Sequence, residues 1–296
     1  MDTARCRAFL AAAESGTITK AAEQLGYTTS GVSQLINALE KDLGAKLLLR
    51  EPRGVKLSKE GKQFYPVIKQ LVKQEEMMYQ LAADVQGLSV GTVTITAYPS
   101  ISAHWLPKVI RRFQDAFPQI RIDLREGFRK EVSQWLSDKT ADVAFMSYMD
   151  PMPFEWIPLA EDPMRAVLSR SHPLAGEKCY PLNRIKEEKF IMPAFVYDDD
   201  VKQLFQKNGL EPRIEITTLE SPSALAMIEE NLGMGITNQL VLEGMNYDVV
   251  KIPLDPPQHL DLGIAIQSLE DASPAVKKFV DFAVRTLTTE EETRSK

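Results

Sequence analysis

The sequence has no long apolar run and contains little cysteine. No stretch approaches the eighteen or more apolar residues that a membrane-spanning helix needs. A short apolar stretch near the N-terminus is followed by a polar helical pattern, whereas a signal peptide would continue to a cleavage site. Cys6 and Cys179 are far apart in the sequence, which is typical of reduced thiols, and nothing in the sequence brings them together as a redox-sensing pair. We therefore expect a cytoplasmic protein without a membrane partner.

The sequence also lacks the short motifs of common enzymes. It contains neither the G-x-S-x-G turn that carries a nucleophilic serine nor the G-x-x-x-x-G-K-[ST] loop that holds phosphates. Its three histidines, His104, His172 and His259, do not form a metal-binding set, and we interpret them as structural or exposed. We therefore predict that the protein is not an enzyme and has no catalytic residues, no cofactor and no metal site.

The charge of the chain is distributed unevenly. The net charge of −6 alone argues against nucleic acid as a partner, yet residues 1–90 carry 12 basic and 10 acidic side chains. Within residues 41–73 there are nine basic and three acidic side chains. This pattern fits a small DNA-binding head on an acidic body. A solvated helix face would explain the charges equally well.

Three helices are predicted at the start of the chain. The first covers residues 4–14, and Thr17 is the expected N-cap of the second, which ends at Gly26. Thr28 is the expected N-cap of the third, over residues 28–41. One face of this third helix is apolar, and the opposite face carries Ser30, Ser33, Gln34, Asn37 and Lys41. These side chains can donate and accept hydrogen bonds, so the helix is a candidate for the DNA major groove, although an ordinary surface helix fits as well.

Residues 46–57 predict a β-hairpin wing. Two short extended segments surround a turn that contains proline and glycine, and the hairpin carries Arg50, Arg53 and Lys56. Guanidinium groups on a wing can reach a narrow minor groove or the phosphates. The wing is therefore the second expected DNA contact.

A long helix is predicted from the Ser58 N-cap to about residue 88. Apolar residues repeat in it at heptad spacing, at Phe64, Leu71, Met78 and Val85, with Val67, Leu81 and Leu88 at the complementary positions. This pattern indicates a short coiled-coil seam and predicts a homodimer. The alternative is a helix that packs on its own domain. Pro66 is expected to kink this helix.

From residue 91 onward, short β-rich segments alternate with helices. Strands are predicted at 93–96, 120–124, 142–147, 165–169, 190–192, 214–217, 235–237, 249–252 and 263–267. Helices are predicted at 102–116, 130–138, 199–208, 222–231 and 274–288. This alternation predicts α/β layers with largely parallel sheets.

Taken together, these segments resemble the LysR-type transcriptional regulator family over essentially the whole chain. In the first 61 residues the resemblance is carried by Phe9, Gly16, Ile18 to Ala22, Leu25, Ser30 to Ser33, Ile36, Leu39, Glu40, Leu43, Gly44, Leu47, Arg50, Arg53, Leu57, Ser58, Glu60 and Gly61. Looser landmarks follow at Leu106-Pro107, Phe113, Phe117-Pro118, Ile120, Glu126-Gly127, Ala141 to Ala144, His172 to Ala175 and Gly233 to Ile236.

The resemblance implies a DNA-binding transcriptional regulator. It implies a winged helix-turn-helix domain at 1–58, a linker dimerisation helix at 59–90, and an effector-binding domain at 91–296. The last would be a two-lobed α/β domain like a periplasmic binding protein, with lobe I at 91–163 plus 265–296 and lobe II at 164–264. A small-molecule effector would bind between the lobes, and dimers of such proteins usually join into homotetramers.

The sequence departs from the family pattern at several positions. The family often has Gln and Arg where this chain has Thr29 and Gln34, and a Leu-Pro pair where it has Asn238-Gln239. Pro66 in the linker is also unusual for the family. These departures leave the fold intact but prevent transfer of any particular operator or effector. For contacts with double-stranded promoter DNA, we predict Thr28, Thr29, Ser30, Ser33, Gln34, Asn37, Arg50 and Arg53.

The effector site is expected where the first strand of the body ends. The helix after it begins near Ser100 and Ser102, so these hydroxyls and free backbone N–H groups could hold the carboxylate of an organic acid, although one of the two serines should simply cap the helix. Family placement adds Phe128, Met146, Ser147, Phe195, Tyr197, Ser221, Thr237 and Asn238. The three aromatic residues favour a ligand with some apolar area.

Two other classes of protein remain as alternatives. A solute-binding protein would share the fold of the body, but it would need an export signal and no DNA-binding head. An enzyme would need a converging set of catalytic residues, and the sequence suggests none.

Overall fold

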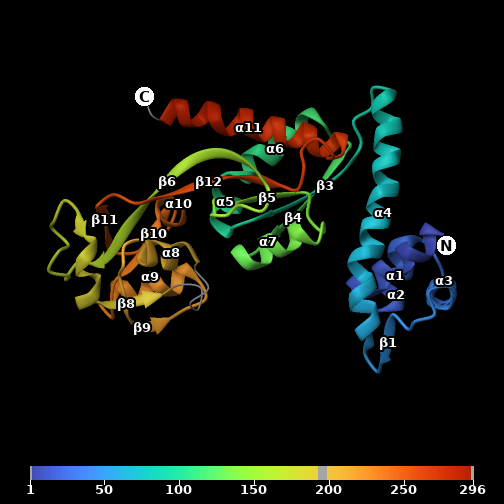
Figure 1. Ribbon diagram of the computed structural model, residues 1–296, viewed down its shortest axis with the longest axis horizontal. Helices are drawn as coiled ribbons and strands as arrows, with labels where there is room; N and C mark the ends of the chain where they lie inside the picture. The colour runs from blue at the N-terminus through green and yellow to red at the C-terminus, as the bar shows by residue number, and fades with distance from the viewer. Residues whose placement is uncertain (1, 193–198, 295–296) are drawn as a thin grey trace. The chain divides into compact units, whose positions relative to one another are not determined.

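The structure is a computed structural model that describes residues 2–192 and 199–294. The chain forms two compact units, and in Figure 1 most of the first is coloured blue to cyan and most of the second green to red. The first consists of Met1–Thr92 with the short segments Ser137–Thr140 and Ser273–Ala275, and the second contains the rest. In the part of the chain that is described, no helix combines the length and the apolar character that crossing a membrane requires.

Three helices build the head of the first unit: α1 (Thr3–Ser15), α2 (Ile18–Leu25) and α3 (Thr29–Leu43). The predicted caps are confirmed, because Thr17 Oγ1 accepts a hydrogen bond from the backbone N–H of Lys20, and Thr28 Oγ1 accepts one from Gly31. The helices pack around a common apolar core. Phe9 and Leu39 are completely buried in it, so the inner face of α3 is fixed and its polar face is directed outward.

The predicted wing is a two-stranded hairpin of β1 (Leu48–Glu51) and β2 (Gly54–Leu57). The strands pair so closely that only Pro52 and Arg53 form the turn. Gly54 has a φ of 145°, and a Cβ atom there would lie 2.2 Å from the carbonyl oxygen of Gly16. Only glycine therefore permits the wing to lie this close to the α1–α2 turn.

The long helix α4 (Lys59–Val85) begins after Ser58, whose Oγ accepts a hydrogen bond from Gly61 as predicted. The helix runs through Pro66, and its first half packs on the head with Ile68 and Val72 buried. Phe64, expected in the heptad seam, instead packs against the same core, so the prediction for this residue is wrong. The other six members of the predicted seam are exposed: Val67, Leu71, Met78, Leu81, Val85 and Leu88.

An eight-stranded mixed sheet runs through the second unit. It contains β3 (Gly91–Ala97), β4 (Ile120–Glu126), β5 (Val143–Ser147), β6 (Glu155–Ser169), β7 (Tyr180–Pro181), β10 (Gly235–Asn238), β11 (Val249–Asp255) and β12 (His259–Ile266). The strand order is β4-β3-β5-β12-β6-β11-β7, with β10 also paired to β6. A separate parallel pair joins β8 (Lys189–Met192) to β9 (Arg213–Thr217).

The expectation of largely parallel sheets is wrong. The strand β12 is antiparallel to both β5 and β6, and β6 is antiparallel to β10 and β11. The reason is that β6 is 15 residues long and serves both lobes: its first half pairs with β12, and its second half pairs with β10 and β11. The sequence suggested only the second half, since Pro158 and Pro163 interrupt the apolar pattern of the first.

Helices cover the sheet on both lobes. They are α5 (Pro99–His104), α6 (Leu106–Ala116), α7 (Arg129–Ser137), α8 (Asp199–Lys207), α9 (Ser221–Glu229), α10 (Gln239–Leu242), α11 (Pro274–Arg294) and the 3₁₀ helix η1 (Leu182–Glu187). The single helix expected at 102–116 is divided at Trp105. The new helix begins at Leu106, and Pro107 lies in its first turn, where proline is tolerated because its missing N–H could not have continued the old helix.

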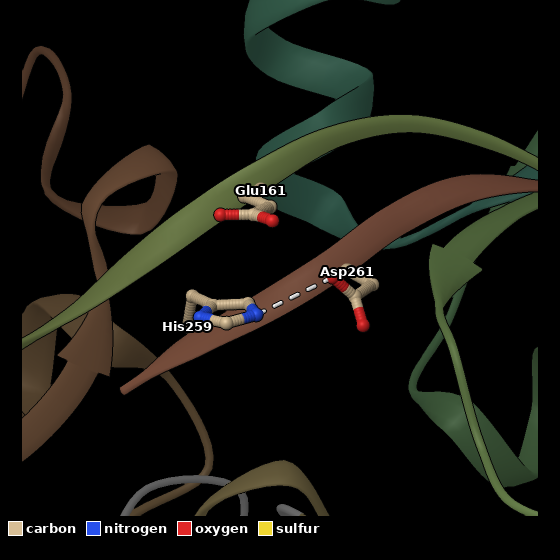
Figure 2. Close-up of side chains that lie close together, drawn as sticks. All are labelled: Glu161, His259 and Asp261. Atoms are coloured by element: carbon tan, nitrogen blue, oxygen red, sulfur yellow. Dashed lines mark ion pairs between the residues drawn. The ribbon is translucent and has the colours of Figure 1, made fainter. Parts of the chain in front are cut away.

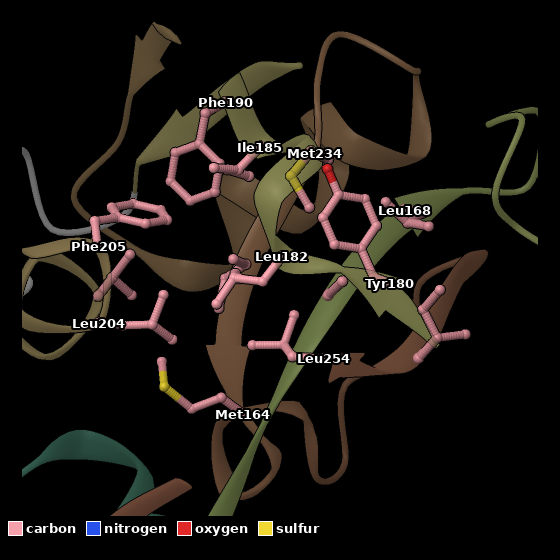
Figure 3. Close-up of a cluster of buried hydrophobic side chains, with 14 of the residues drawn as sticks. Met164, Leu168, Tyr180, Leu182, Ile185, Phe190, Leu204, Phe205, Met234 and Leu254 are labelled. Carbon is pink, nitrogen blue, oxygen red and sulfur yellow. The ribbon is translucent and has the colours of Figure 1, made fainter. Parts of the chain in front are cut away.

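Each lobe has its own apolar core. In lobe I, Phe113, Phe145 and Phe279 make edge-to-face contacts. In lobe II, Figure 3 shows Tyr180, Phe190 and neighbouring leucines and methionines packed against one another. Because the two cores are separate, the lobes are connected mainly by the strands that run between them. A cleft can form at this connection.

Candidate DNA-binding surface and effector cleft

The eight predicted DNA-binding residues all lie on the surface of the first unit. Seven are exposed, and Ser33 is half-buried. The Thr28 hydroxyl caps α3 and lies 3.1 Å from Ser30 Oγ, so part of its hydrogen-bonding capacity is used within the helix. The sequence did not point to Tyr27, which is 51% exposed and directly precedes Thr28, the N-cap of α3. Its hydroxyl adds a polar group beside the predicted contacts.

The wing offers positive charge at its surface. Lys56 pairs with Glu51, but no ion pair among the described residues involves Arg50 or Arg53. These two guanidinium groups lie on β1 and in the adjoining turn, and both are exposed. A basic group with no acidic partner among the described residues is available to neutralise a phosphate.

Glu40 connects the end of α3 to the wing. Its buried carboxylate accepts hydrogen bonds from the backbone N–H groups of Leu47, at 2.8 Å, and Leu48, at 3.1 Å, and from Lys46 Nζ at 2.6 Å. Burial raises the pKa of this carboxyl group, but the hydrogen bonds from Lys46, Leu48 and Leu47 outweigh it and hold the pKa below its ordinary value. The charged form therefore fixes the wing relative to the helix.

A cavity of about 300 Å³ lies in the second unit between the two lobes. Five predicted effector residues line it: Ser100, Phe128, Ser221, Thr237 and Asn238. Phe195 and Tyr197 lie outside the described residues. The volume suits a small metabolite.

Three other predicted residues, Ser102, Met146 and Ser147, are not among those that line the cavity. Ser102 and Met146 are buried in the lobe, because Ser102 lies on the inner side of α5 and every residue of β5 is covered. The expectation that Ser100 or Ser102 caps the helix is wrong. The helix starts at Pro99, one residue before Ser100. Its N-cap is Tyr98, and no side chain forms a capping hydrogen bond.

Two charged residues that the sequence did not single out, Arg129 and Asp200, also line the cavity. Arg129, only 6% exposed, begins α7 and forms an ion pair with Asp200 of α8. Ser147 Oγ lies 2.8 and 3.0 Å from the two carboxylate oxygens of Asp200, and 3.1 Å from Tyr98 Oη. Arg129 and Ser147 come from lobe I and Asp200 from lobe II, so the cluster joins the lobes. The sequence signal that could have found Arg129 is its position directly after Phe128, which was one of the predicted effector residues.

Asn238 has a structural role beside its place at the cavity. Its side-chain amide donates a hydrogen bond to Asp162, which also accepts one from the backbone N–H of Leu240 at 3.2 Å. Burial raises the pKa of Asp162, and the hydrogen bonds from Asn238 and the backbone only partly offset it. The pair holds the turn between β10 and α10.

One group of side chains in the described part of the chain has the spacing of metal ligands. Glu161 on β6 and His259 and Asp261 on β12 have ligand atoms within 4.8 Å of one another (Figure 2). The sequence did not associate His259 with any metal-binding set, because Glu161 is distant from it along the chain.

Comparison with known families identifies both parts of the chain. Residues 4–62 match the family described as bacterial regulatory helix-turn-helix protein, lysR family, and residues 86–288 match the LysR substrate binding domain. The chain belongs to the LysR family of transcriptional regulators. It is therefore a DNA-binding regulator with an effector-binding domain, as predicted, and the relatives reported below are regulators of transcription rather than enzymes.

Among LysR-family relatives, the HTH-type transcriptional regulator YvbU of Bacillus subtilis is 33% identical over 96% of this chain and 98% of its own. BenM of Acinetobacter baylyi is 26% identical over 92% of each chain. The likeness therefore covers the DNA-binding and effector domains together.

Solved structures of LysR-family regulators have the same fold. Full-length CbnR in complex with its target DNA has a TM-score of 0.69 at 22% identity and covers 97% of this chain and 99% of its own. Full-length BenM has a TM-score of 0.61 at 25% identity, with 99% and 98% covered. The predicted fold class, a winged helix-turn-helix with a linker helix and a two-lobed α/β domain, is confirmed.

Proposed function

We propose that this LysR-family regulator reads promoter DNA with α3 and the wing, and that it responds to an organic acid that binds beside Arg129. The observation that carries the proposal is a buried arginine in the wall of a 300 Å³ cavity between two lobes. A guanidinium group recognises a carboxylate through two parallel hydrogen bonds. In the structure, Arg129 pairs with a carboxylate of the protein itself, that of Asp200.

The DNA-binding part of this proposal rests on the exposed face of α3. Its side chains would read base edges and hold phosphates: Thr28, Thr29, Ser30, Ser33, Gln34 and Asn37. Gln34 can form a paired contact with adenine, and Arg50 and Arg53 of the wing would approach the minor groove or the phosphates. A dimer would place two such heads on half-sites about one helical turn apart, or a multiple of it.

The effector part of the proposal rests on competition between two carboxylates. The acid group of the effector would replace Asp200 at Arg129 and receive further hydrogen bonds from Ser147 and Tyr98. Ser100, Phe128, Ser221, Thr237 and Asn238 line the same cavity and would contact the remainder of the ligand. Because Asp200 belongs to lobe II, its displacement would alter the contact between the lobes, which is how binding could reach the DNA-binding head.

The linker helix supports the proposed assembly. Its exposed apolar residues, Met78, Leu81 and Val85 among them, lie at heptad spacing and have no partner within the described chain. We expect α4 to pair with a second copy and form a homodimer, and dimers to join into a homotetramer. We also propose that the domain boundaries lie between residues 58 and 59 and between residues 90 and 91. A cytoplasmic location, where the chromosome is accessible, is part of the same proposal.

Two measurements test the proposal. Fluorescence anisotropy with the promoter DNA upstream of the protein's own gene, at two salt concentrations, should show binding that weakens as salt rises. A melting-temperature screen with aliphatic and aromatic carboxylic acids, each beside its neutral amide, should show stabilisation by an acid and not by its amide. Equal stabilisation by acids and amides would contradict the role of Arg129, and failure to bind the promoter DNA would contradict the role of α3.

A further inference from the structure

The two strands that connect the lobes carry a polar cluster that the effector cleft does not use. Glu161 lies on β6, and His259 and Asp261 lie on β12, with all three side chains exposed. Figure 2 shows their ligand atoms gathered over the pair of strands. We propose that these residues form a binding site for a first-row divalent transition metal ion of the zinc type.

The strand register explains why the three side chains converge. Asp261 pairs directly with Glu161 across the antiparallel ladder, and His259 lies two residues before Asp261. Directly paired residues and residues two apart on a strand share one face of a sheet. The ligand atoms of the three residues therefore all lie within 4.8 Å of one another, although Glu161 is nearly 100 positions from His259 in the chain.

The site is on the opposite face of the strands from the effector cavity. Leu260, between His259 and Asp261, lines that cavity, and Asp162, next to Glu161, is buried and holds the turn after β10. Because side chains alternate between the faces of a strand, the three candidate ligands are directed away from the cavity. A metal ion there would not compete with the effector for space.

The donor set selects the class of metal. One imidazole nitrogen and two carboxylate oxygens suit zinc and neighbouring divalent ions, with water as the remaining ligand, whereas Ca²⁺ and Mg²⁺ prefer oxygen ligands alone. Metal–ligand bonds of about 2.1 Å place ligand atoms about 3.4 Å apart in a tetrahedron. His259 Nε2 and Asp261 Oδ1 are already 3.5 Å apart, so the Glu161 side chain has the larger adjustment to make.

The backbone under the site is held in place. The ladder of β6 and β12 continues on both sides of the pair Glu161–Asp261, and the carbonyl oxygen of Asp261 accepts a hydrogen bond of 2.8 Å from Tyr148 at the end of β5. Ligands on a fixed backbone lose only side-chain freedom when they bind an ion. A metal here would join β6 to β12 where they connect the lobes, and so restrict movement of one lobe relative to the other.

The test is titration of the full-length protein with zinc chloride by isothermal calorimetry, after removal of metals with a chelator. A Cys179→Ser background excludes zinc binding at that partly exposed thiol. We expect one zinc ion per chain at this site, at least tenfold weaker binding in both His259→Ala and Asp261→Asn, and little heat with Ca²⁺ or Mg²⁺. His172→Gln, a histidine outside the cluster, is the matched control and should bind as the background protein does.

The same variants distinguish this site from adventitious zinc. The three side chains are exposed, so their substitution should leave the circular dichroism spectrum and the melting temperature of the zinc-free protein unchanged. Zinc should raise the melting temperature of the background protein and of His172→Gln, but not that of His259→Ala or Asp261→Asn. Absence of zinc binding, or binding that His259→Ala leaves intact, would overturn the proposal.

Discussion

The DNA-binding head and the effector domain differ in how their candidate sites are assembled. The eight candidate DNA contacts come from one stretch, residues 28–53, in which a helix and a hairpin follow each other directly. The effector cavity is lined by residues from several separate segments, of which Tyr98 is the first along the chain and Leu260 the last. A local site can be read from periodicity and caps, whereas a cleft depends on which distant side chains the fold brings together.

The strongest test of this contrast is at Arg129. In Arg129→Gln the cavity keeps its shape but loses the charge that would hold a carboxylate. Removing one partner of a buried charge pair costs about 2–5 kcal/mol, so the affinity for the acid effector should fall by on the order of 100-fold. Isothermal calorimetry with the acid found by the melting-temperature screen measures this change.

Asp200→Asn provides the matched control with the opposite sign. It removes the carboxylate that pairs with Arg129 but retains a side chain of the same size. The acid should bind several-fold more tightly to this variant, because no charge of the protein has to be displaced. Weaker binding to Asp200→Asn would show that Asp200 supports the ligand instead of competing with it.

The sequence predicted the head more completely than the cleft, for physical reasons. The caps at Thr17, Thr28 and Ser58 follow from local backbone geometry, and all three were confirmed. Arg129 and Asp200 are 71 positions apart, and burial and charge pairing between them exist only after folding. Phe64 matched the heptad pattern but packs against the head core. Periodicity shows which residues share one face of a helix, but it does not show what that face packs against.

The proposed role of the linker helix α4 depends on a second copy of the chain. Leu81→Glu places a charge in the exposed apolar seam, where Leu81 is 47% exposed. We expect the dimer to dissociate and the apparent affinity for promoter DNA to fall at least tenfold, since each head would then bind alone. Light scattering coupled to gel filtration measures the mass. Ala83→Glu, on the other side of α4, is the control and should remain dimeric. If Leu81→Glu also remains dimeric, the proposed coiled-coil seam is wrong.

A smaller effect is expected in the wing. Arg53→Ala removes one exposed guanidinium from each head, so affinity for DNA should fall about tenfold on all sequences and the salt slope should decrease by about one. Anisotropy titrations at several salt concentrations check this. Gln34→Ala should instead change the preference for particular bases, and Arg111→Ala, an exposed arginine of α6, should alter neither. An unchanged salt slope in Arg53→Ala would show that the wing does not contact the DNA through Arg53.

The smallest effect concerns Glu40, which connects the helix and the wing. Glu40→Gln keeps one acceptor oxygen but loses the charge, so the wing should lose about 1 kcal/mol of local stability. Amide hydrogen exchange at Leu47 and Leu48, whose N–H groups bond to Glu40, should therefore be about fivefold faster at neutral pH.

The pH dependence of that exchange shows whether the charge is responsible. The folded pKa of Glu40 is below its ordinary value of 4.5, so the stabilisation is complete above that value and is lost as the pH falls through the depressed folded pKa. The ratio of exchange rates between Glu40→Gln and the wild type cancels the intrinsic effect of pH and should decline toward one in acid. A constant ratio would mean that shape, and not charge, fixes the wing to α3, so that even this local part of the head would depend on packing in the folded state.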